Sequence, residues 1–240
     1  MILRVLDLFS GIGGFSLGLE RTGGFKTFAF CEIEEYPRKV IAKHWPDVPC
    51  FRDVRELKGI DIGTVDVICG GFPCQDLRSA GSSLGIGEVT RIGLFREMLR
   101  IASECGNPII IFENVSRILS GPTENPGEWF YEFLNSLAEI GYDAEWFCVT
   151  AASVGAPHYR DRLWVVAYPH KTQLERGGVS KRVFEEHANI IGTSWWEIEP
   201  PVGRVANGVP QQSHRLGCLG NSVVPVIPEI IGRAILGAMK

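Results

Sequence analysis

The sequence predicts a single α/β domain with a mostly parallel central sheet. The chain has 240 residues, of which 45% are hydrophobic and 22% are charged, enough for one domain with a sizeable core. Short apolar, strand-like runs alternate with helical segments along the chain, an order typical of α/β folds. Glycines and acidic residues follow directly where several of these runs end. In open α/β folds this edge of the sheet is where ligands bind.

Charge and cysteine content limit the classes of function. A formal net charge of −4 argues against a general nucleic-acid binder, so phosphate contacts would come from a local basic patch. The seven cysteines are odd in number and lack C-x-x-C spacing, which argues against a disulfide framework or a zinc site and favours a reducing cytoplasm. We expect the start of the chain to be a strand rather than a signal peptide, and no apolar run to be long enough to cross a bilayer.

A glycine-rich turn follows the first predicted strand. Residues 2–8 are mostly apolar, residues 9–15 read Phe-Ser-Gly-Ile-Gly-Gly-Phe, and residues 16–21 are helical in pattern. Strand, glycine-rich turn and helix together form a cradle for a nucleotide or nucleoside. The G-x-G-G spacing differs from the dinucleotide fingerprint, and a tight strand–helix connection is the alternative.

Acidic residues follow the next two predicted strands. Glu32 comes directly after the strand at 26–31, where a carboxylate can hydrogen-bond ribose hydroxyls. A helix is expected over 34–44, and then a short strand at 51–54 that contains Asp53. Either acid alone could be a helix cap or a solvated carboxylate. Together they favour a ligand, and the lack of a P-loop lysine makes that ligand a nucleoside derivative.

Cys74 is the candidate nucleophile. A buried strand at 65–69 leads into Gly-Gly-Phe-Pro-Cys-Gln, which places one thiol on a rigid loop at the sheet edge. A glycine- and serine-rich stretch to about Arg91 follows and is expected to be a functional lid or disordered. The alternative for Cys74 is a free core cysteine.

Glu113 and two arginines are candidates at the same edge. A helix is expected over 93–105 and a buried strand over 108–112, at the end of which desolvation would raise the pKa of Glu113. Arg160 and Arg162 precede a strand at 163–167 and would point the same way, which suits a phosphate or a base oxygen. A helix-capping role for Glu113 and a surface network of the arginines with an aspartate are the alternatives.

The remaining segments complete the domain. A helix is expected over 128–140 and a strand over 142–150, whereas the polar segment 168–201 looks like an insertion outside the sheet. The last helix, 226–239, is strongly apolar and is expected to pack beside the first glycine-rich turn. Asn221 and Ser222 would cap its beginning.

In combination these motifs resemble those of the DNA (cytosine-C5) methyltransferases of small bacterial or phage type. The segments that carry the resemblance, in the family's order, are Asp7–Phe15, Gly70–Gly81, Glu113-Asn114-Val115, Arg160-x-Arg162 and Gly220–Val224. The resemblance implies a Rossmann-like S-adenosylmethionine-dependent methyltransferase fold with helices on both faces of the sheet. It also implies a catalytic domain at 1–167, a very short target-recognition insertion at 168–203 and a C-terminal segment at 204–240.

The resemblance further implies site residues and their roles. Cys74 would attack C6 of a flipped-out cytosine, Glu113 would hold N3 and the exocyclic amine, Arg162 would bind the base O2, and Arg160 would stabilise the loop and a nearby phosphate. Glu32 would bind the cofactor ribose and Asp53 the adenine amine. The implied cofactor contacts are Phe9, Gly11, Ile12, Glu32, Asp53, Val54, Pro73, Leu94, Asn221 and Val223.

The implied cofactor is S-adenosylmethionine, which leaves as S-adenosylhomocysteine, with no metal. The implied partners are double-stranded DNA and a cognate restriction endonuclease, with no membrane, for a cytoplasmic monomer of bacterial or phage origin. Four positions depart from the family pattern, namely Ile33, Arg78, Ile92 and His158. Two other functions stay open: methylation of tRNA cytosine, as in relatives with the same motifs, and non-catalytic binding of the cofactor or DNA, which Arg78 and the short insertion would favour.

Overall fold

The computed structural model describes residues 1–72, 91–121, 125–172, 174, 177–190 and 212–239. The strands are β1 (Leu3–Leu8), β2 (Phe25–Cys31), β3 (Cys50–Phe51), β4 (Val67–Gly70), β5 (Ile109–Val115), β6 (Tyr142–Thr150) and β7 (Asp161–Pro169). The α-helices are α1 (Gly14–Arg21), α2 (Glu35–His44), α3 (Gly59–Ile62), α4 (Arg91–Glu104), α5 (Glu128–Glu139), α6 (Gly178–Ile190), α7 (Gln212–Asn221) and α8 (Val226–Ala238). Short 3-10 helices cover Ser116–Leu119 and Ala152–Val154.

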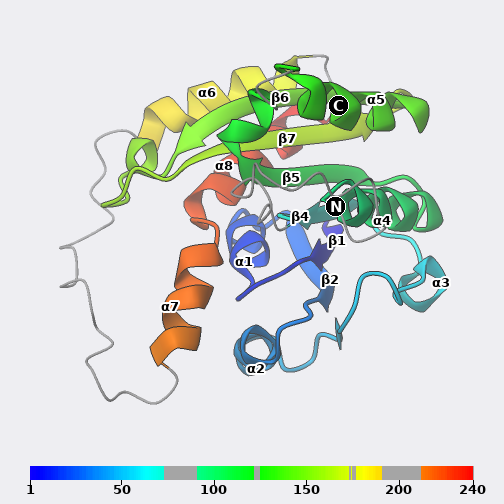
Figure 1. Ribbon diagram of the computed structural model, residues 1–240, viewed down its shortest axis with the longest axis vertical. Helices are drawn as coiled ribbons and strands as arrows, with labels where there is room; N and C mark the ends of the chain where they lie inside the picture. Colours follow the sequence, from blue (N-terminus) through cyan, green and yellow to red (C-terminus); the bar gives the residue numbers. More distant parts are fainter. Residues whose placement is uncertain (73–90, 122–124, 173, 175–176, 191–211, 240) are drawn as a thin grey trace.

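These strands form one seven-stranded sheet in the order β3-β2-β1-β4-β5-β7-β6 (Figure 1). Neighbouring strands from β3 to β5 are parallel, whereas β7 is antiparallel to both β5 and β6. The prediction of an α/β fold with a mostly parallel sheet is therefore confirmed. The antiparallel direction of β7 was not predicted, and it matters because it brings the beginning of β7 to the carboxyl end of β5.

The strand order reverses between β1 and β4. From β1 the chain builds outward through β2 and β3, then returns to β4 on the other side of β1 and continues to β5. In open α/β sheets, ligands bind beyond the carboxyl ends of the strands at such a reversal. Both the glycine-rich turn after β1 and the Gly-Gly pair after β4 begin there.

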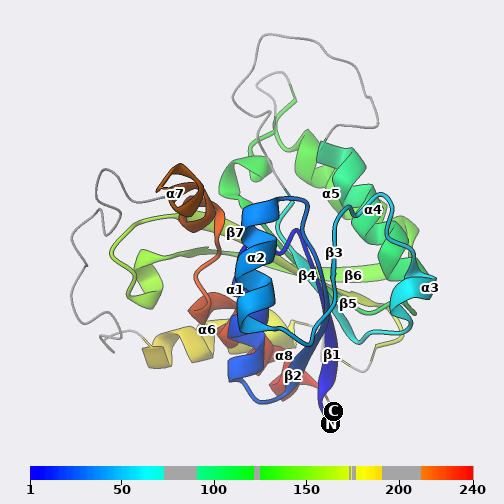
Figure 2. The same ribbon diagram turned by 90° about the horizontal axis from the view of Figure 1, so that it is seen from below.

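Helices cover both faces of the sheet (Figure 2). On one face α1, α6 and α8 pack around a buried cluster that includes Phe15, Trp164 and Ile231. On the other face α4 and α5 supply a second cluster rich in aromatic rings, with Phe95 and Phe133 stacked at 4.3 Å between ring centroids. The central strands are buried from both sides, so their sequences read as nearly continuous apolar runs.

The last helix packs against the glycine-rich turn, as predicted. A Cβ at Gly14 would lie 2.9 Å from Cγ2 of Val223, and a Cβ at Gly18 would clash with the carbonyl oxygen of Pro225. The predicted cap was wrong: Asn221 ends α7, the N-cap of α8 is Pro225, and Ser222 donates a hydrogen bond to the Val223 carbonyl at 3.1 Å. The chain stays helical up to Asn221, so the turn before α8 starts later than we expected.

The first two residues of the expected insertion, 168 and 169, belong to the sheet, and its helix α6 contributes to the core. Strand β7 continues to Pro169, and α6 packs on α8 with Val179 and Val183 in the main core. Glu145 on β6 anchors the start of α6, since its Oε2 accepts hydrogen bonds from the N–H and hydroxyl of Ser180 at 2.8 and 2.7 Å. The many polar residues of this segment made it look exposed, although the apolar residues on one face of α6 are buried. Residues 191–203 of the expected insertion fall outside the described residues.

Residues Gly217–Ala238 are long and apolar enough, by composition, to cross a membrane, so the expectation that no run reaches this length needs correction. In the structure this stretch comprises the end of α7 and the whole of α8, separated by residues 222–225, and half of it is buried. Core helices of soluble proteins have the same composition. The stretch therefore does not by itself indicate a membrane span.

Candidate functional site

The glycine-rich turn has one open side. Phe9, Gly11 and Gly13 all have positive φ angles, of 53°, 54° and 84°. A Cβ placed on Gly11 would meet nothing within 4 Å. A ligand can therefore approach the backbone at Gly11 closely, which is the property a nucleoside cradle requires.

Asp7, in β1, holds the helix that follows the turn. Its side chain is fully buried, and its Oδ2 accepts hydrogen bonds from the Ser16 hydroxyl at 2.7 Å and the Ser16 N–H at 3.2 Å. Burial raises the pKa of Asp7 to about 7, against the lowering effect of the Ser16 hydrogen bonds. The sequence placed Asp7 in the segment Asp7–Phe15 that carries the resemblance but gave it no role of its own, although an acid in a mostly apolar strand just before a glycine-rich turn was the available signal.

Glu32 closes the turn from the end of β2. Its Oε2 accepts a hydrogen bond from the Gly11 N–H at 2.7 Å, and its Oε1 accepts one from the Glu34 N–H at 2.8 Å. Burial raises the pKa of Glu32, and the two backbone N–H groups counteract this. The carboxylate thus lies directly at the turn, as expected for a ribose-binding acid, and it also fixes the backbone of the turn.

Asp53 follows the two-residue strand β3, which is shorter than predicted. Arg55 binds both oxygens of its carboxylate through Nε, at 2.9 and 3.1 Å, and adds a contact from Nη2. The hydrogen bond with Arg55 lowers the pKa of Asp53. Val54, the next residue, is buried among the side chains that α4 covers.

The pair Gly70-Gly71 lets the chain pass tightly over the sheet edge. A Cβ at Gly70 would clash with the carbonyl oxygen of Leu8, and one at Gly71 would lie 2.8 Å from Oε2 of Glu113. Gly71 thus touches the Glu113 carboxylate three residues before Cys74. Cys74 and Pro73 themselves fall outside the described residues.

Glu113 and Arg162 form a partly enclosed ion pair at this edge. Glu113 is opposite Trp164 in the β5–β7 ladder, so Arg162, two residues from Trp164, presents its side chain on the same face. Arg162 Nε lies 2.9 Å from Glu113 Oε1, and the two side chains are 22% and 12% exposed. Burial raises the pKa of Glu113, as the sequence predicted, while Arg162 and Arg160 oppose the shift.

Arg160 makes a different contact from Arg162. Its Nη1 donates a hydrogen bond of 2.6 Å to the Gly220 carbonyl, near the end of α7. Its backbone has φ 26°, a value that non-glycine residues rarely adopt. Burial and the neighbouring Arg162 lower the pKa of Arg160. The arginine therefore links the start of β7 to the segment that packs against Gly14.

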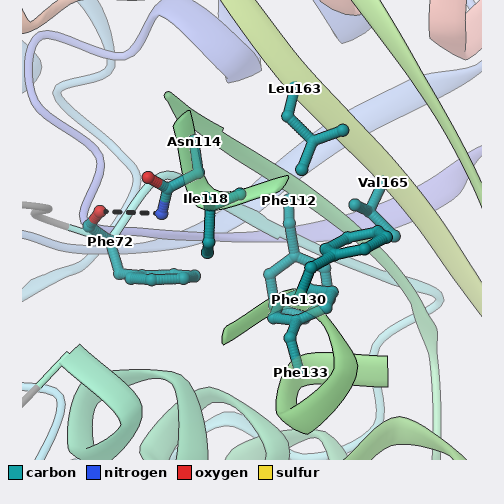
Figure 3. A pocket seen from close by; sticks show the side chains of 8 residues that line it. All are labelled: Phe72, Phe112, Asn114, Ile118, Phe130, Phe133, Leu163 and Val165. Carbon is teal, nitrogen blue, oxygen red and sulfur yellow. Dashed lines mark hydrogen bonds between the residues drawn. The ribbon is translucent and has the colours of Figure 1, made fainter. Parts of the chain in front are cut away.

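Asn114 points to the opposite face of the sheet. Its Nδ2 lies 3.5 Å from the Phe72 carbonyl oxygen, beside an apolar cavity of about 10 Å³ (Figure 3). The other residues that line this cavity are Phe112, Ile118, Phe130, Phe133, Leu163 and Val165. The cavity lies behind the start of the Pro-Cys-Gln loop and is large enough for about one water molecule.

The other expected cofactor contacts that the structure describes come from different elements. Val223 packs on Gly14, Asn221 is at the end of α7, and Leu94 on α4 lies against the second core cluster. Phe9 and Ile12 belong to the turn itself. Within the part of the chain that the structure describes, no group of three or more His, Cys, Asp or Glu side chains could hold a metal ion.

The described cysteines are poor nucleophiles. All six are free thiols, at positions 31, 50, 69, 105, 148 and 218. Burial raises the pKa of every one of them, to about 12 for Cys31 and about 11 for Cys105. A thiol with a raised pKa holds little of the reactive thiolate.

Fold and site together define an α/β protein with an open glycine-rich turn after β1 and a partly enclosed carboxylate–guanidinium pair between β5 and β7. Residues 3–214 match the family described as C-5 cytosine-specific DNA methylase, and the chain belongs to this family. It is 31% identical to the Type II methyltransferase M.Sau3AI of Staphylococcus aureus, an alignment that covers 95% of this chain and 62% of that protein. It is 34% identical to M.CviJI of a Paramecium bursaria Chlorella virus, over 94% of this chain and 57% of the relative.

Solved structures agree with this assignment. A putative DNA modification methyltransferase encoded within a prophage of Escherichia coli is 28% identical, with a TM-score of 0.58, over 72% of this chain and 48% of that one. The Dnmt2 methyltransferase of S. pombe, 20% identical with a TM-score of 0.57 over 85% of this chain and 58% of that one, shares the fold. The chain spans about half the length of the curated relatives it matches.

Proposed function

We propose that this protein transfers a methyl group from S-adenosylmethionine to C5 of cytosine in double-stranded DNA, through a covalent bond between Cys74 and C6 of a flipped-out base. The observation that carries the proposal is the partly enclosed Glu113–Arg162 pair, whose carboxylate lies close to Gly71, three residues before Cys74 in the sequence. Membership of the C-5 cytosine-specific DNA methylase family supports the same reaction.

The residues at the glycine-rich turn fit the proposed cofactor. The open side of Gly11 admits a ligand next to the backbone, and Glu32 lies beside it to accept hydrogen bonds from ribose hydroxyls. Asp53 would accept a hydrogen bond from the adenine amine. Its carboxylate would then bind both that amine and Arg55. When bound, S-adenosylmethionine supplies an electrophilic methyl group. Phe9, Ile12, Val54, Pro73, Leu94, Asn221 and Val223 remain proposed contacts.

Cys74 would act as a thiolate that bonds to C6 of the ring. That addition places negative charge on C5, which then takes the methyl group. A base removes the proton from C5, the electron pair re-forms the C5–C6 double bond, and the Cys74 sulfur leaves. A guanidinium close to the Cys74 sulfur, such as that of Arg160 or Arg162, would favour the thiolate.

Glu113 and Arg162 would stabilise the charge that develops on the base. A protonated Glu113 donates a hydrogen bond to N3 and accepts one from the exocyclic amine, and Arg162 donates to O2. The raised pKa of Glu113 suits this role, because a carboxyl group can donate only when it holds a proton. Donors placed in advance at these positions cost no reorganisation during the reaction.

The proposal also covers the DNA-recognition segment, the partners and the cellular location of the protein. A target-recognition segment would lie at residues 168–203, and its short length favours a short recognised site. We expect a monomer in a bacterial cytoplasm that works with a cognate restriction endonuclease and needs neither a metal nor a membrane.

Methyl transfer from tritiated S-adenosylmethionine tests this function. We expect incorporation into duplex DNA in the presence of a chelator, and none by Cys74→Ala. Transfer to tRNA but not to DNA would show that the substrate is RNA rather than DNA. No transfer by the wild-type protein, or full transfer by Cys74→Ala, would contradict the proposal.

A further inference from the structure

The side of the glycine-rich turn opposite its open face rests on Trp45. A Cβ at Gly13 would come within 2.6 Å of Cζ3 and 2.8 Å of Cη2 of the indole, so the outer edge of that ring lies against the Gly13 backbone. Gly13 is thus restricted twice, by its φ of 84° and by the ring behind it. Gly11, two residues earlier, has open space on its side. The turn is supported on one side and free on the other.

The indole is held in this position by Glu20. The Trp45 Nε1–H donates a hydrogen bond of 3.0 Å to Glu20 Oε2, and the Thr27 N–H donates one of 2.9 Å to Glu20 Oε1. Glu20 lies on α1, the helix that the turn begins, and Thr27 lies on β2. One carboxylate therefore connects the helix after the turn, the neighbouring strand and the ring behind Gly13.

Two further contacts fix Trp45. The ring packs at 5.2 Å on Phe30, which is fully buried in β2. The Trp45 backbone N–H donates to the Ile41 carbonyl at 2.7 Å, which places the residue at the end of α2. Trp45 belongs to neither of the two core clusters and is half-buried, so its contacts are with the turn and its supports rather than with the core.

We infer that Trp45 is a positioning residue that sets the backbone of the glycine-rich turn for cofactor binding, with Glu20 holding its ring. The inference depends on the proposed function, since the ligand of the turn is taken to be S-adenosylmethionine. Trp45 does not touch the open side of the turn, so its effect is on affinity for the cofactor through Gly13. The methyl-transfer step uses other residues, namely Cys74 after β4, Glu113 near the end of β5 and Arg162 near the start of β7, so we expect that step to be unchanged.

The test compares two substitutions with a matched control. Trp45→Leu removes the ring, and Trp45→Phe keeps an aromatic side chain that lacks the N–H and is too short to reach Gly13. Trp146→Leu is the control. Trp146 is a 48% exposed tryptophan on β6, the strand at one edge of the sheet, and it packs on Phe130. Calorimetry with S-adenosylhomocysteine gives Kd, and tritium transfer gives KM for the cofactor and kcat.

We expect Kd and KM for the cofactor to rise about tenfold in Trp45→Leu and about threefold in Trp45→Phe, with kcat at saturating cofactor within twofold of wild type. Trp146→Leu should match the wild type in all three. A purely structural role would lower the melting temperature without this split between KM and kcat. If Trp45→Leu does not fold, Trp45→Phe decides.

Different results would contradict the proposed function and the positioning role of Trp45. If the wild-type protein does not bind S-adenosylhomocysteine, the proposed function is at fault. If the wild type binds and both Trp45 variants bind equally well, the positioning role is overturned. An equal rise in Trp146→Leu also overturns it, because the effect would then not depend on the turn.

Discussion

The two ends of the candidate site use their buried carboxylates for different purposes. At the glycine-rich turn, Asp7 and Glu32 accept hydrogen bonds from N–H and hydroxyl groups of the turn and of the helix after it. At the end of β5, Glu113 instead faces the guanidinium of Arg162. The first arrangement fixes the shape of a backbone, whereas in the second burial raises the pKa of the Glu113 carboxyl group and the guanidinium of Arg162 opposes that rise.

This difference leads to separate expectations for the two ends. Changes at the turn should alter stability and cofactor affinity, because its carboxylates are engaged in holding the fold. Changes at Glu113 should alter the reaction, because its carboxylate is available to a ligand. The following experiments are ordered by the size of the expected effect.

Glu113→Gln should have the largest effect. The amide can still accept a hydrogen bond but cannot hold the proton that the base N3 requires, so methyl transfer should fall about 10³-fold. Affinity for S-adenosylhomocysteine should not change, since Glu113 lies away from the turn. Turnover close to that of the wild type would show that the carboxyl group of Glu113 is not used in the reaction.

Asp7 should make stability depend on pH. Its pKa is raised to about 7 in the fold, well above that of an exposed aspartate, so the folded state binds the proton more tightly. The contribution of Asp7 to the free energy of unfolding is therefore fully present below pH 4. It is lost as the pH rises towards 7, by on the order of 4 kcal/mol.

Asp7→Asn removes this titration. We expect the fall in the free energy of unfolding between pH 4.5 and 7.5, measured by urea denaturation, to be smaller in the variant than in the wild type. Glu32 and Glu113 also have raised pKa values and contribute a fall of the same sign in both proteins. Identical pH profiles for the two proteins would contradict the assignment.

Two arginine substitutions compare the ends directly. Arg162→Met leaves the Glu113 carboxylate buried without its ion-pair partner and should destabilise the fold by about 3 kcal/mol at pH 8. The loss should shrink in acid, because a protonated Glu113 needs no counter-charge. Arg55→Met removes the partner of Asp53 from a pair whose arginine is 55% exposed, against 22% for Arg162, and should lower the melting temperature much less. Similar losses in the two variants would mean that the Glu113 pair is not effectively buried.

Gly18→Ala tests the packing of α8 against the turn. The new methyl group would clash with the Pro225 carbonyl, so we expect a loss of about 2 kcal/mol, measured as a fall in melting temperature. Gly217→Ala, in α7, is the control, because a Cβ there meets nothing within 4 Å and alanine favours a helix. If both substitutions stabilise the protein, α8 does not sit on α1 as described.

Much of the fold could be predicted from the sequence because local patterns determine it. The strands that end at Cys31 and Gly70 are followed directly by an acid and by a glycine, and β6 has the bounds that its alternation predicted. The position of Glu113 at the end of a buried strand was enough to predict a raised pKa. Each of these features depends on a few neighbouring residues.

The contacts between residues far apart in the sequence could not be predicted, because they depend on which helices and strands meet in space. Nothing near Arg160 in the sequence indicates a hydrogen bond to Gly220, sixty residues later. The contact of Trp45 with Gly13 requires α2 to end beneath the turn. The burial of Val179 and Val183 depends on α8, which follows much later in the chain.

The most direct test of the account is covalent trapping by duplex DNA that contains 5-fluorocytosine. Fluorine at C5 cannot leave as a proton does, so the Cys74 sulfur should stay bonded to C6 after methyl transfer. We predict a complex that survives denaturing gels, requires S-adenosylmethionine and is absent in Cys74→Ala. A wild-type protein that binds both cofactor and DNA yet forms no such complex would contradict the account.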